Sequence, residues 1–366
     1  MRTLVGWGLF AVMAPCPVRV LPAQERTTVG GYGEVHYANP TGPKTPPVVN
    51  LARFVVYLAH SFDDRLAFRS ELEVEDAKLE GGRPGGEVAL EQAYLDYRLA
   101  GWITLRTGLV LPPVGIVNET HEPPTFNGVE RPGFDHDVIP TTWREIGVGA
   151  VGTVPGGSGL AYRVYLVNGL RADGLSAGEG IREGRQEGRQ ASFANPSVTG
   201  RLEWARPGLK FGGSFWYGGT ADTNTAVGSG TFGAPVALVS ADARFDTGPF
   251  ALRAEVATIS VSDAQEINAA YGRSVGSRIA GGYLEAAYKV RHTKLNAFVR
   301  HERYDTQASV PAGATRDRSL ARRITTLGVT YKPTWNTAFK GDYQLLRNAA
   351  GAGEFEVLSL GVGYQF

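Results

Sequence analysis

Hydrophobic and polar residues alternate one by one in segments of about ten residues along most of this chain. In the segment 66–75, Leu66, Phe68, Leu72 and Val74 share one face, and the charged residues occupy the other. A period of two is typical of β-strands, whereas a helix repeats every 3.6 residues. About ten residues is also the length that a tilted strand needs to cross a bilayer. The pattern therefore predicts an all-β protein whose strands have one apolar and one polar face.

The same alternation recurs along the chain, at 93–99, 103–109, 198–204, 209–217, 250–256, 327–331 and 339–345. The connections alternate as well. Tight turns fall at 63–64, 206–208, 246–249, 291–293 and 332–334, and long polar loops at 170–196, 218–235, 262–276 and 305–320. Hairpins with turns at one end and loops at the other are typical of outer-membrane barrels. We count about sixteen strands from Val29 onward, and predict an antiparallel transmembrane β-barrel.

The composition excludes several other classes of protein. The 48 glycines and only two methionines disfavour a helical fold, and 37 basic against 36 acidic residues give no basic surface for nucleic acid. The single cysteine, Cys16, lies in the N-terminal apolar region, so we expect no disulfide and no thiolate metal site in the mature chain. We expect no cofactor.

The first 23 residues are typical of a secretory signal peptide. Arg2 precedes an apolar run from Leu4 to Met13, and the stretch Leu21-Pro22-Ala23 resembles a cleavage site. We expect residues 1–23 to be removed and residues 24–366 to form the barrel. A membrane anchor is the alternative, but the run is shorter than the roughly 20 residues of a spanning helix. A lipoprotein signal at Cys16 is disfavoured by Pro15.

The C-terminal segment predicts how such a barrel would be assembled. Leu358, Leu360, Val362, Tyr364 and Phe366 lie on one face of a strand that ends in an aromatic residue. This resembles the terminal signature through which outer-membrane proteins are recognised for assembly. We expect the barrel-assembly machinery as a partner through the strand ending at Phe366, together with outer-membrane lipid and lipopolysaccharide. An ordinary C-terminal edge strand is the alternative.

The segment 111–143 differs from the other long connections. It is rich in Val, Ile, Phe, Trp and proline, which argues against disorder, and loops beyond about 15 residues are usually functional. Its apolar residues need a wall to pack against, and the interior of the barrel is the nearest one. We therefore expect a constriction loop at 111–143 that folds inward and narrows the pore.

Several stretches around this loop resemble the phosphate-selective porin O and P family. They are Arg106–Gly115, Asn118–His121, Glu130–Pro132, Ile139-Pro140, Trp143–Gly149 and Tyr165–Gly169. The resemblance implies a sixteen-stranded trimeric porin with an inward third loop. The best-known members line their pores with basic residues, whereas the predicted inner face here also carries acidic residues such as Glu75.

Candidate site residues follow from the loop and from the alternation. For the pore constriction we expect Glu119, His121, Glu122, Glu130, Arg131, Arg144 and Glu145. For the lumen wall we expect Arg69, Glu71, Glu73, Arg106, Arg163, Arg201, Glu203, Lys210, Arg253 and Glu255. His121 with Glu122, and Asp135-His136-Asp137, have metal-ligand chemistry, but their spacing favours solvated polar residues. The charge-dense stretch 182–189 is expected to be a solvated loop that touches lipopolysaccharide.

The favoured function is passive diffusion of small hydrophilic solutes or ions, phosphate among them, through an aqueous lumen in the outer membrane. No catalytic residue is expected. One alternative is a barrel enzyme with a filled lumen, in which a nucleophile and a base would meet near one rim. Another is a soluble secreted β-rich binding protein, which would pack its aromatic residues inward rather than in interfacial girdles.

Overall fold

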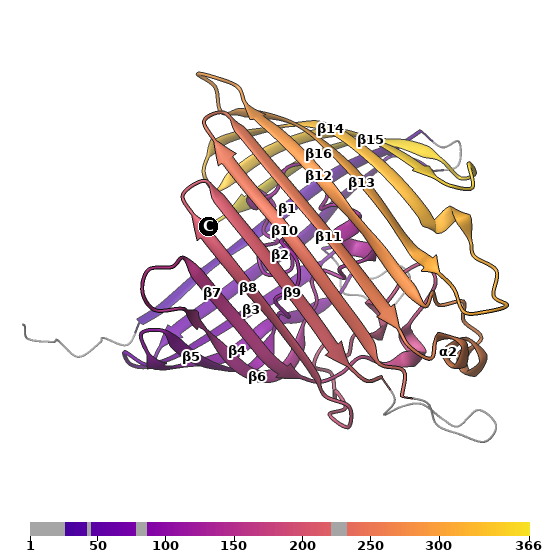
Figure 1. Ribbon diagram of the computed structural model, residues 1–366. Coiled ribbons are helices and arrows are strands. Elements are labelled where there is room, and N and C mark those ends of the chain that lie inside the picture. The colour runs from indigo at the N-terminus through magenta and orange to yellow at the C-terminus, as the bar shows by residue number, and fades with distance from the viewer. Residues whose placement is uncertain (1–25, 42–44, 78–85, 221–232) are drawn as a thin grey trace, which may run out of the picture.

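A computed structural model describes residues 26–41, 45–77, 86–220 and 233–366 (Figure 1). The expected signal peptide at 1–23 lies outside the described residues. Within them the regular secondary structure is almost entirely β-sheet, as the alternation predicts. Its strands are β1 (Arg26–Pro40), β2 (Val48–Ser61), β3 (Leu66–Glu75), β4 (Val88–Ala100), β5 (Ile103–Val110), β6 (Glu145–Thr153), β7 (Leu160–Val167), β8 (Ser197–Arg206), β9 (Leu209–Gly218), β10 (Val236–Thr247), β11 (Phe250–Val261), β12 (Arg278–Lys289), β13 (Leu295–Ser309), β14 (Ala321–Thr334), β15 (Thr337–Asn348) and β16 (Phe355–Gln365).

These sixteen strands form one closed antiparallel barrel, so the predicted fold class is confirmed. Each strand pairs with its neighbours in sequence, and β1 closes the ring by pairing with β16. In that closing pair Val35 lies opposite Val362, and the backbone N–H of Phe366 donates to the carbonyl of Gly31 at 2.8 Å. Closure leaves none of the sixteen described strands at the edge of a sheet.

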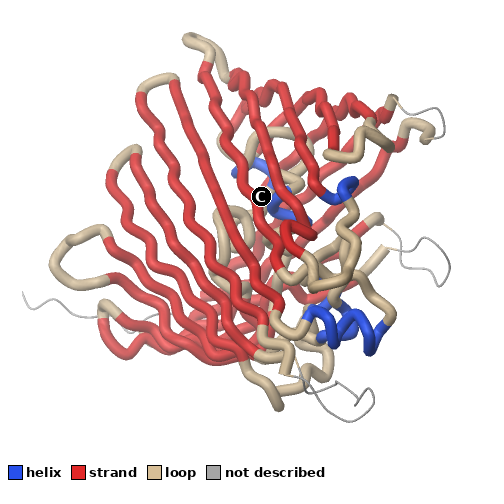
Figure 2. Tube along the Cα trace, turned by 45° about the vertical axis from the view of Figure 1, so that its right-hand side comes forward, coloured by secondary structure: helices blue, strands red, loops and turns tan. Residues whose placement is uncertain are grey.

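The two ends of the barrel differ in the length of their connections (Figure 2). At one end the strands are joined by turns at 62–65, 101–102, 154–159, 207–208, 248–249, 290–294 and 335–336. The opposite end carries the longer connections, including 111–144, 168–196 and 262–277. The short helix α2 (Ala264–Tyr271) lies in the last of these, where the sequence predicted an irregular loop.

The outer face of the barrel is apolar. On β14, for example, Leu327, Val329 and Tyr331 are exposed, whereas Thr326 and Thr330 at alternate positions are buried on the inner side. Exposed aromatic side chains gather near the end that carries the turns: Trp102, Phe211, Phe245, Phe250, Tyr288, Trp335, Phe339 and Phe366. Among the described residues, no helix has the length and hydropathy of a transmembrane segment.

The hydrophobic core lies inside the barrel rather than between two sheets. It is built where the long connections fold against the inner wall, and it includes Trp143, Phe134 and Ile139 of the 111–144 connection. Leu175 and Ile181 of the 168–196 connection belong to the same cluster. The interior at the end with the long connections is therefore largely packed by these apolar side chains.

Candidate functional site

The segment Leu111–Arg144 between β5 and β6 folds inward, as predicted, and is called the constriction loop below. It contains the short helices η1 (Pro123–Thr125) and α1 (Phe134–Asp137). Trp143 is fully buried and its ring lies 4.2 Å, centroid to centroid, from that of Trp216 on β9. Because a loop has no ladder of its own, such apolar contacts with the wall are needed to fix its course.

Acidic side chains of the wall hold the backbone of the constriction loop. The N–H of Ile116 donates to both carboxylate oxygens of Glu255 at 3.2 Å, and the N–H of Phe134 donates to Glu302 at 2.9 Å. The N–H of Val129 donates to Asp342 at 2.6 Å. These hydrogen bonds satisfy buried backbone N–H groups that would otherwise lack a partner.

Two glycines of β16 let the loop approach the wall. A Cβ atom on Gly361 would lie 2.9 Å from Val129, and one on Gly363 would overlap Pro123 in η1. The η1 part of the constriction loop therefore lies against β15, β16 and β1, and the α1 part lies against β12 and β13. The side of the lumen lined by β3, β5 and β7 to β10 stays open.

That open side holds a cavity of about 710 Å³ between the constriction loop and the wall. Six basic residues line it: Arg69, Arg106, Arg163, Arg201, Lys210 and Arg244. Four acidic residues line it as well: Glu71, Glu119, Glu122 and Glu203. All six basic residues belong to the barrel wall, whereas Glu119 and Glu122 belong to the loop that faces it. The charges create a field across the cavity, because they are unevenly distributed between its two sides.

Most of the basic side chains are fixed by carboxylates. Arg106 donates to both oxygens of Asp96, at 2.8 and 2.9 Å, and its guanidinium lies 3.9 Å from the centre of the Tyr94 ring. Arg163 lies 3.2 Å from Glu119 of the loop. Arg69 pairs with no carboxylate among the described residues, so its charge faces the cavity uncompensated.

A second cluster of paired charges lies on β8 and β10. Arg201 donates to both oxygens of Asp242, at 2.6 and 3.0 Å, and to Glu203 at 3.1 Å. Arg244 also donates to Glu203, at 3.2 Å, and Lys210 lies 4.0 Å from it. Glu203 thus lies within 4.0 Å of three basic groups at the edge of the cavity. Because only Glu203 and Asp242 oppose them, the net charge of this cluster is positive.

The constriction residues expected from sequence divide into two groups. Glu119 and Glu122 line the cavity. Glu130 does not line it and instead pairs with His36 of β1 at 2.7 Å, while Arg131 reaches Thr141 within the loop at 3.4 Å. His121 is 3% exposed and lies behind the cavity wall, in contact with Glu91.

Arg144 and Glu145, expected at the constriction, are buried away from the cavity. Glu145 is fully buried and accepts hydrogen bonds from the side chains of Trp143 and Asn168 and from the N–H of Gln186. Arg144 donates to Glu187 at 3.2 Å. Both residues join the constriction loop to the 168–196 connection, whose position is not apparent from sequence.

The ten residues expected on the lumen wall all belong to strands and point inward. Seven line the cavity: Arg69, Glu71, Arg106, Arg163, Arg201, Glu203 and Lys210. The other three lie under the constriction loop. Glu255 holds Ile116, Arg253 donates to the carbonyl of Thr125 at 3.1 Å, and Glu73 lies 4.0 Å from Arg53, whose side chain reaches the carbonyl of His121.

Arg244 and Glu91 were missed in the sequence analysis. Arg244 follows Ser240 and Asp242 on the inward face of β10, so the alternation of that strand could have identified it. Glu91 is the extra residue of a β-bulge, because Glu71 pairs with Gln92 and Leu72 pairs with Leu90. A bulge shifts the alternation by one position and hides such a residue from pattern analysis.

The charge-dense stretch 182–189 is not a solvated loop, and that expectation was wrong. Arg182 donates to the carbonyl of Thr141 at 2.7 Å, and Arg185 donates to that of Pro140 at 3.2 Å. Both carbonyls belong to the constriction loop. The stretch is therefore held over the loop by hydrogen bonds to its backbone.

Titratable groups of the loop are affected by burial. Burial raises the pKa of Asp135 well above its usual range, and the neighbouring carboxylates of Glu255 and Glu302 raise it further. Neither carboxyl oxygen of Asp135 has a hydrogen-bond partner among the described residues. Burial opposes the charged form of His121, but the adjacent Glu91 outweighs this and raises the pKa of the imidazole.

Comparison with known proteins places the chain by sequence and by fold. No protein-family model matches it, so membership of the phosphate-selective porin O and P family stays a prediction. An uncharacterized protein of Aquifex aeolicus (strain VF5) is 35% identical over 351 residues, which cover 91% of this chain and 79% of that protein.

Solved structures with a similar fold are porins and other outer-membrane proteins. They include OmpF of Salmonella typhi in complex with daunomycin (TM-score 0.64, 15% identity, 94% of this chain and 100% of that one). The anion-selective porin from Comamonas acidovorans is similar too (TM-score 0.60, 13% identity, with the same coverage). A trimer form of OmpT, an outer-membrane protein of Vibrio cholerae, has a TM-score of 0.59 at 11% identity, over 93% of this chain and 99% of that one. These similarities confirm a barrel of the porin type.

Proposed function

The chain belongs to the same family as the uncharacterized Aquifex aeolicus protein, and we propose that it is an outer-membrane porin for passive diffusion of small hydrophilic solutes. The cavity between the constriction loop and the wall carries the proposal. It is lined mainly by charged and polar side chains, which suits water and solutes rather than an apolar ligand. No catalytic residue is part of this proposal.

Membrane insertion is supported by the outer surface. Exposed apolar side chains cover the strands, and aromatic residues such as Trp335 and Phe366 gather at the end with the turns. Apolar bands bordered by aromatic residues match the depth-dependent polarity of a bilayer. The proposal places the protein in the outer membrane, delivered by its signal peptide and inserted through the strand ending at Phe366. It also includes a homotrimer, as expected from the family resemblance, and contact with lipid and lipopolysaccharide.

A preference for anions is the finer part of the proposal. Six basic residues against four acidic ones line the cavity, because Asp96 and Asp242, which pair with Arg106 and Arg201, do not line it. Arg69 forms no ion pair with a carboxylate of the described residues and carries the finer proposal. An excess of positive charge raises the local concentration of anions and their rate of entry. Inorganic phosphate is one anion of suitable size, and an anion-selective porin is among the proteins of similar fold.

The experiment is single-channel recording of the detergent-purified chain in a planar bilayer, with the reversal potential measured under a salt gradient. We expect stable open steps and a reversal potential of the sign that indicates anion preference. Arg69→Gln should move the reversal potential toward cation preference, whereas Arg291→Gln, in the exposed turn before β13, should leave it unchanged. A folded barrel that inserts without current would reject the porin and favour the barrel enzyme with a filled lumen.

A further inference from the structure

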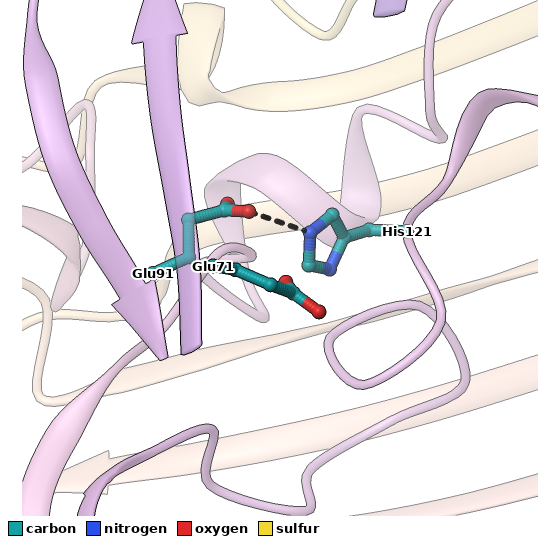
Figure 3. Close-up of side chains that lie close together, drawn as sticks. All are labelled: Glu71, Glu91 and His121. Atoms are coloured by element: carbon teal, nitrogen blue, oxygen red, sulfur yellow. Dashed lines mark hydrogen bonds and ion pairs between the residues drawn. The ribbon is translucent and has the colours of Figure 1, made fainter. Parts of the chain in front are cut away.

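Three side chains with metal-ligand chemistry converge where the constriction loop meets β3 and β4 (Figure 3). Glu71 belongs to β3, Glu91 to β4 and His121 to the loop. One potential ligand atom from each lies within 4.8 Å of the others. Figure 3 shows both carboxylates directed toward the imidazole, with the Glu91–His121 contact drawn as a dashed line.

The imidazole is oriented by a backbone carbonyl. Nδ1 of His121 lies 3.0 Å from the carbonyl oxygen of Asn118. A carbonyl oxygen can only accept, so Nδ1 carries a proton in this contact. Nε2 faces the Glu91 carboxylate 3.2 Å away, and a metal ion bound there would replace the proton that Nε2 shares with Glu91. A hydrogen bond from the second ring nitrogen to a carbonyl is the usual support of a metal-binding histidine.

One carboxylate oxygen of Glu91 has no hydrogen-bond partner among the described residues. This oxygen is Oε1, and the residue is 0% exposed. Its other oxygen, Oε2, accepts from the hydroxyl of Tyr32 at 3.0 Å and contacts His121. A buried carboxylate oxygen without a partner costs free energy, and a bound cation would remove that cost.

The local charge also favours a cation. Glu71 and the buried Glu73 are further carboxylates near Glu91 and His121. Arg53, which also donates to the carbonyl of His121, is paired with Glu34 at 2.6 Å. Two ligand carboxylates would balance a divalent ion. Glu71 also lines the open cavity, which gives an ion a route from the solvent.

We propose that Glu71, Glu91 and His121 bind a divalent transition-metal ion, with Zn²⁺ the best match. Zinc accepts imidazole nitrogen and carboxylate oxygen at about 2.0 to 2.2 Å, so ligand atoms in a tetrahedral site lie about 3.4 Å apart. The Nε2–Oε2 distance of 3.2 Å is close to this value. The ligand atom of Glu71 lies within 4.8 Å of both, so its side chain would have to move closer to complete the site. The Tyr32 hydroxyl lies 2.9 Å from Nε2 and is therefore also close to the proposed ion position. The ion would join the loop to the wall, and its binding does not depend on whether the barrel conducts.

The test measures Zn²⁺ binding to the purified full-length chain in detergent. After removal of metal with a chelator, equilibrium dialysis followed by metal analysis should give one Zn²⁺ per chain. Glu71→Gln is the decisive variant, because no hydrogen bond or ion pair links Glu71 to the Glu91–His121 contact. We expect it to weaken Zn²⁺ binding by at least about tenfold while the barrel remains folded.

The controls separate a metal site from a structural ion pair. His121→Gln should abolish binding, and His292→Gln, which removes an exposed histidine from a turn, should retain it. X-ray absorption at the zinc edge should show one nitrogen ligand among oxygens. If the unmodified chain takes up no stoichiometric Zn²⁺, or if Glu71→Gln binds as tightly as the unmodified chain, the contact serves only to anchor the loop. Neither result bears on conductance, so the porin proposal is tested separately.

Discussion

Glu255 on β11 accepts both of its loop hydrogen bonds from a single backbone group, the N–H of Ile116, at 3.2 Å to each carboxylate oxygen. The two residues are 139 positions apart in sequence. Through this contact, a wall strand fixes the first part of the constriction loop and thereby the width of the open side.

Replacing Glu255 tests whether the wall holds the loop. Glu255→Ala removes the acceptor and leaves the Ile116 N–H buried without a partner, so we expect a loss of about 1 to 3 kcal/mol in the free energy of unfolding. Glu255→Gln keeps an acceptor oxygen and should retain most of that stability. Urea unfolding of the refolded barrel gives the free energies, and single-channel noise should rise in the alanine variant. Equal stability of the two variants would contradict this role.

Asp135 predicts a pH dependence of stability. Its folded pKa is raised, whereas the unfolded chain releases this proton above about pH 4. The folded state therefore binds more protons, and the stability falls as pH rises from about 4 toward the folded pKa, by up to about 1.4 kcal/mol per pH unit for one group. Asp135→Asn should remove this part of the slope in urea unfolding between pH 5 and pH 8.

Trp143 anchors the end of the constriction loop against Trp216. Because the side chain is fully buried, Trp143→Ala should cost about 3 to 5 kcal/mol of unfolding free energy. Trp335, 80% exposed in a turn, provides the matched control, and its alanine variant should unfold at nearly the same urea concentration as the unmodified chain. A small effect at Trp143 would show that the loop does not depend on this core.

Gly363 tests how closely the loop lies against the wall. Its Cβ would overlap Pro123, so Gly363→Ala should displace η1 and cost about 1 to 3 kcal/mol. Gly213→Ala adds the same methyl group on β9, where the nearest atom is 3.9 Å away, and should be tolerated. Thermal unfolding followed by gel mobility compares the two variants.

The fold was predictable because two local signals agree. Alternation identifies strands such as β14, and turns such as 207–208 and 248–249 fix which strands are paired. The inward course of the constriction loop was also predictable, since its apolar residues require a wall. Both signals are carried by neighbouring residues, so a single sequence is enough to detect them.

The details of the site depend on contacts between distant segments. Glu145 is buried because Asn168 and Gln186 fold over it, and nothing near residue 145 indicates that. Glu91 faces the interior because of a bulge in β4, which shifts the alternation by one residue. Sequence patterns therefore located the residues of the lumen wall better than those of the loop.

The position of the constriction loop also has a consequence for how the chain acquires its structure. The wall residues that hold the loop follow it in sequence at separations of 139, 168 and 213 residues. Until β11, β13 and β15 are in place, the loop has no surface to bind, and closing such long segments is entropically costly and slow. The last strands thus complete both the barrel and the position of the loop, because β15 and β16 close the ring and also contact η1 of the constriction loop. In folding intermediates that lack these strands, the barrel would be open and the constriction loop would not yet be bound to its wall.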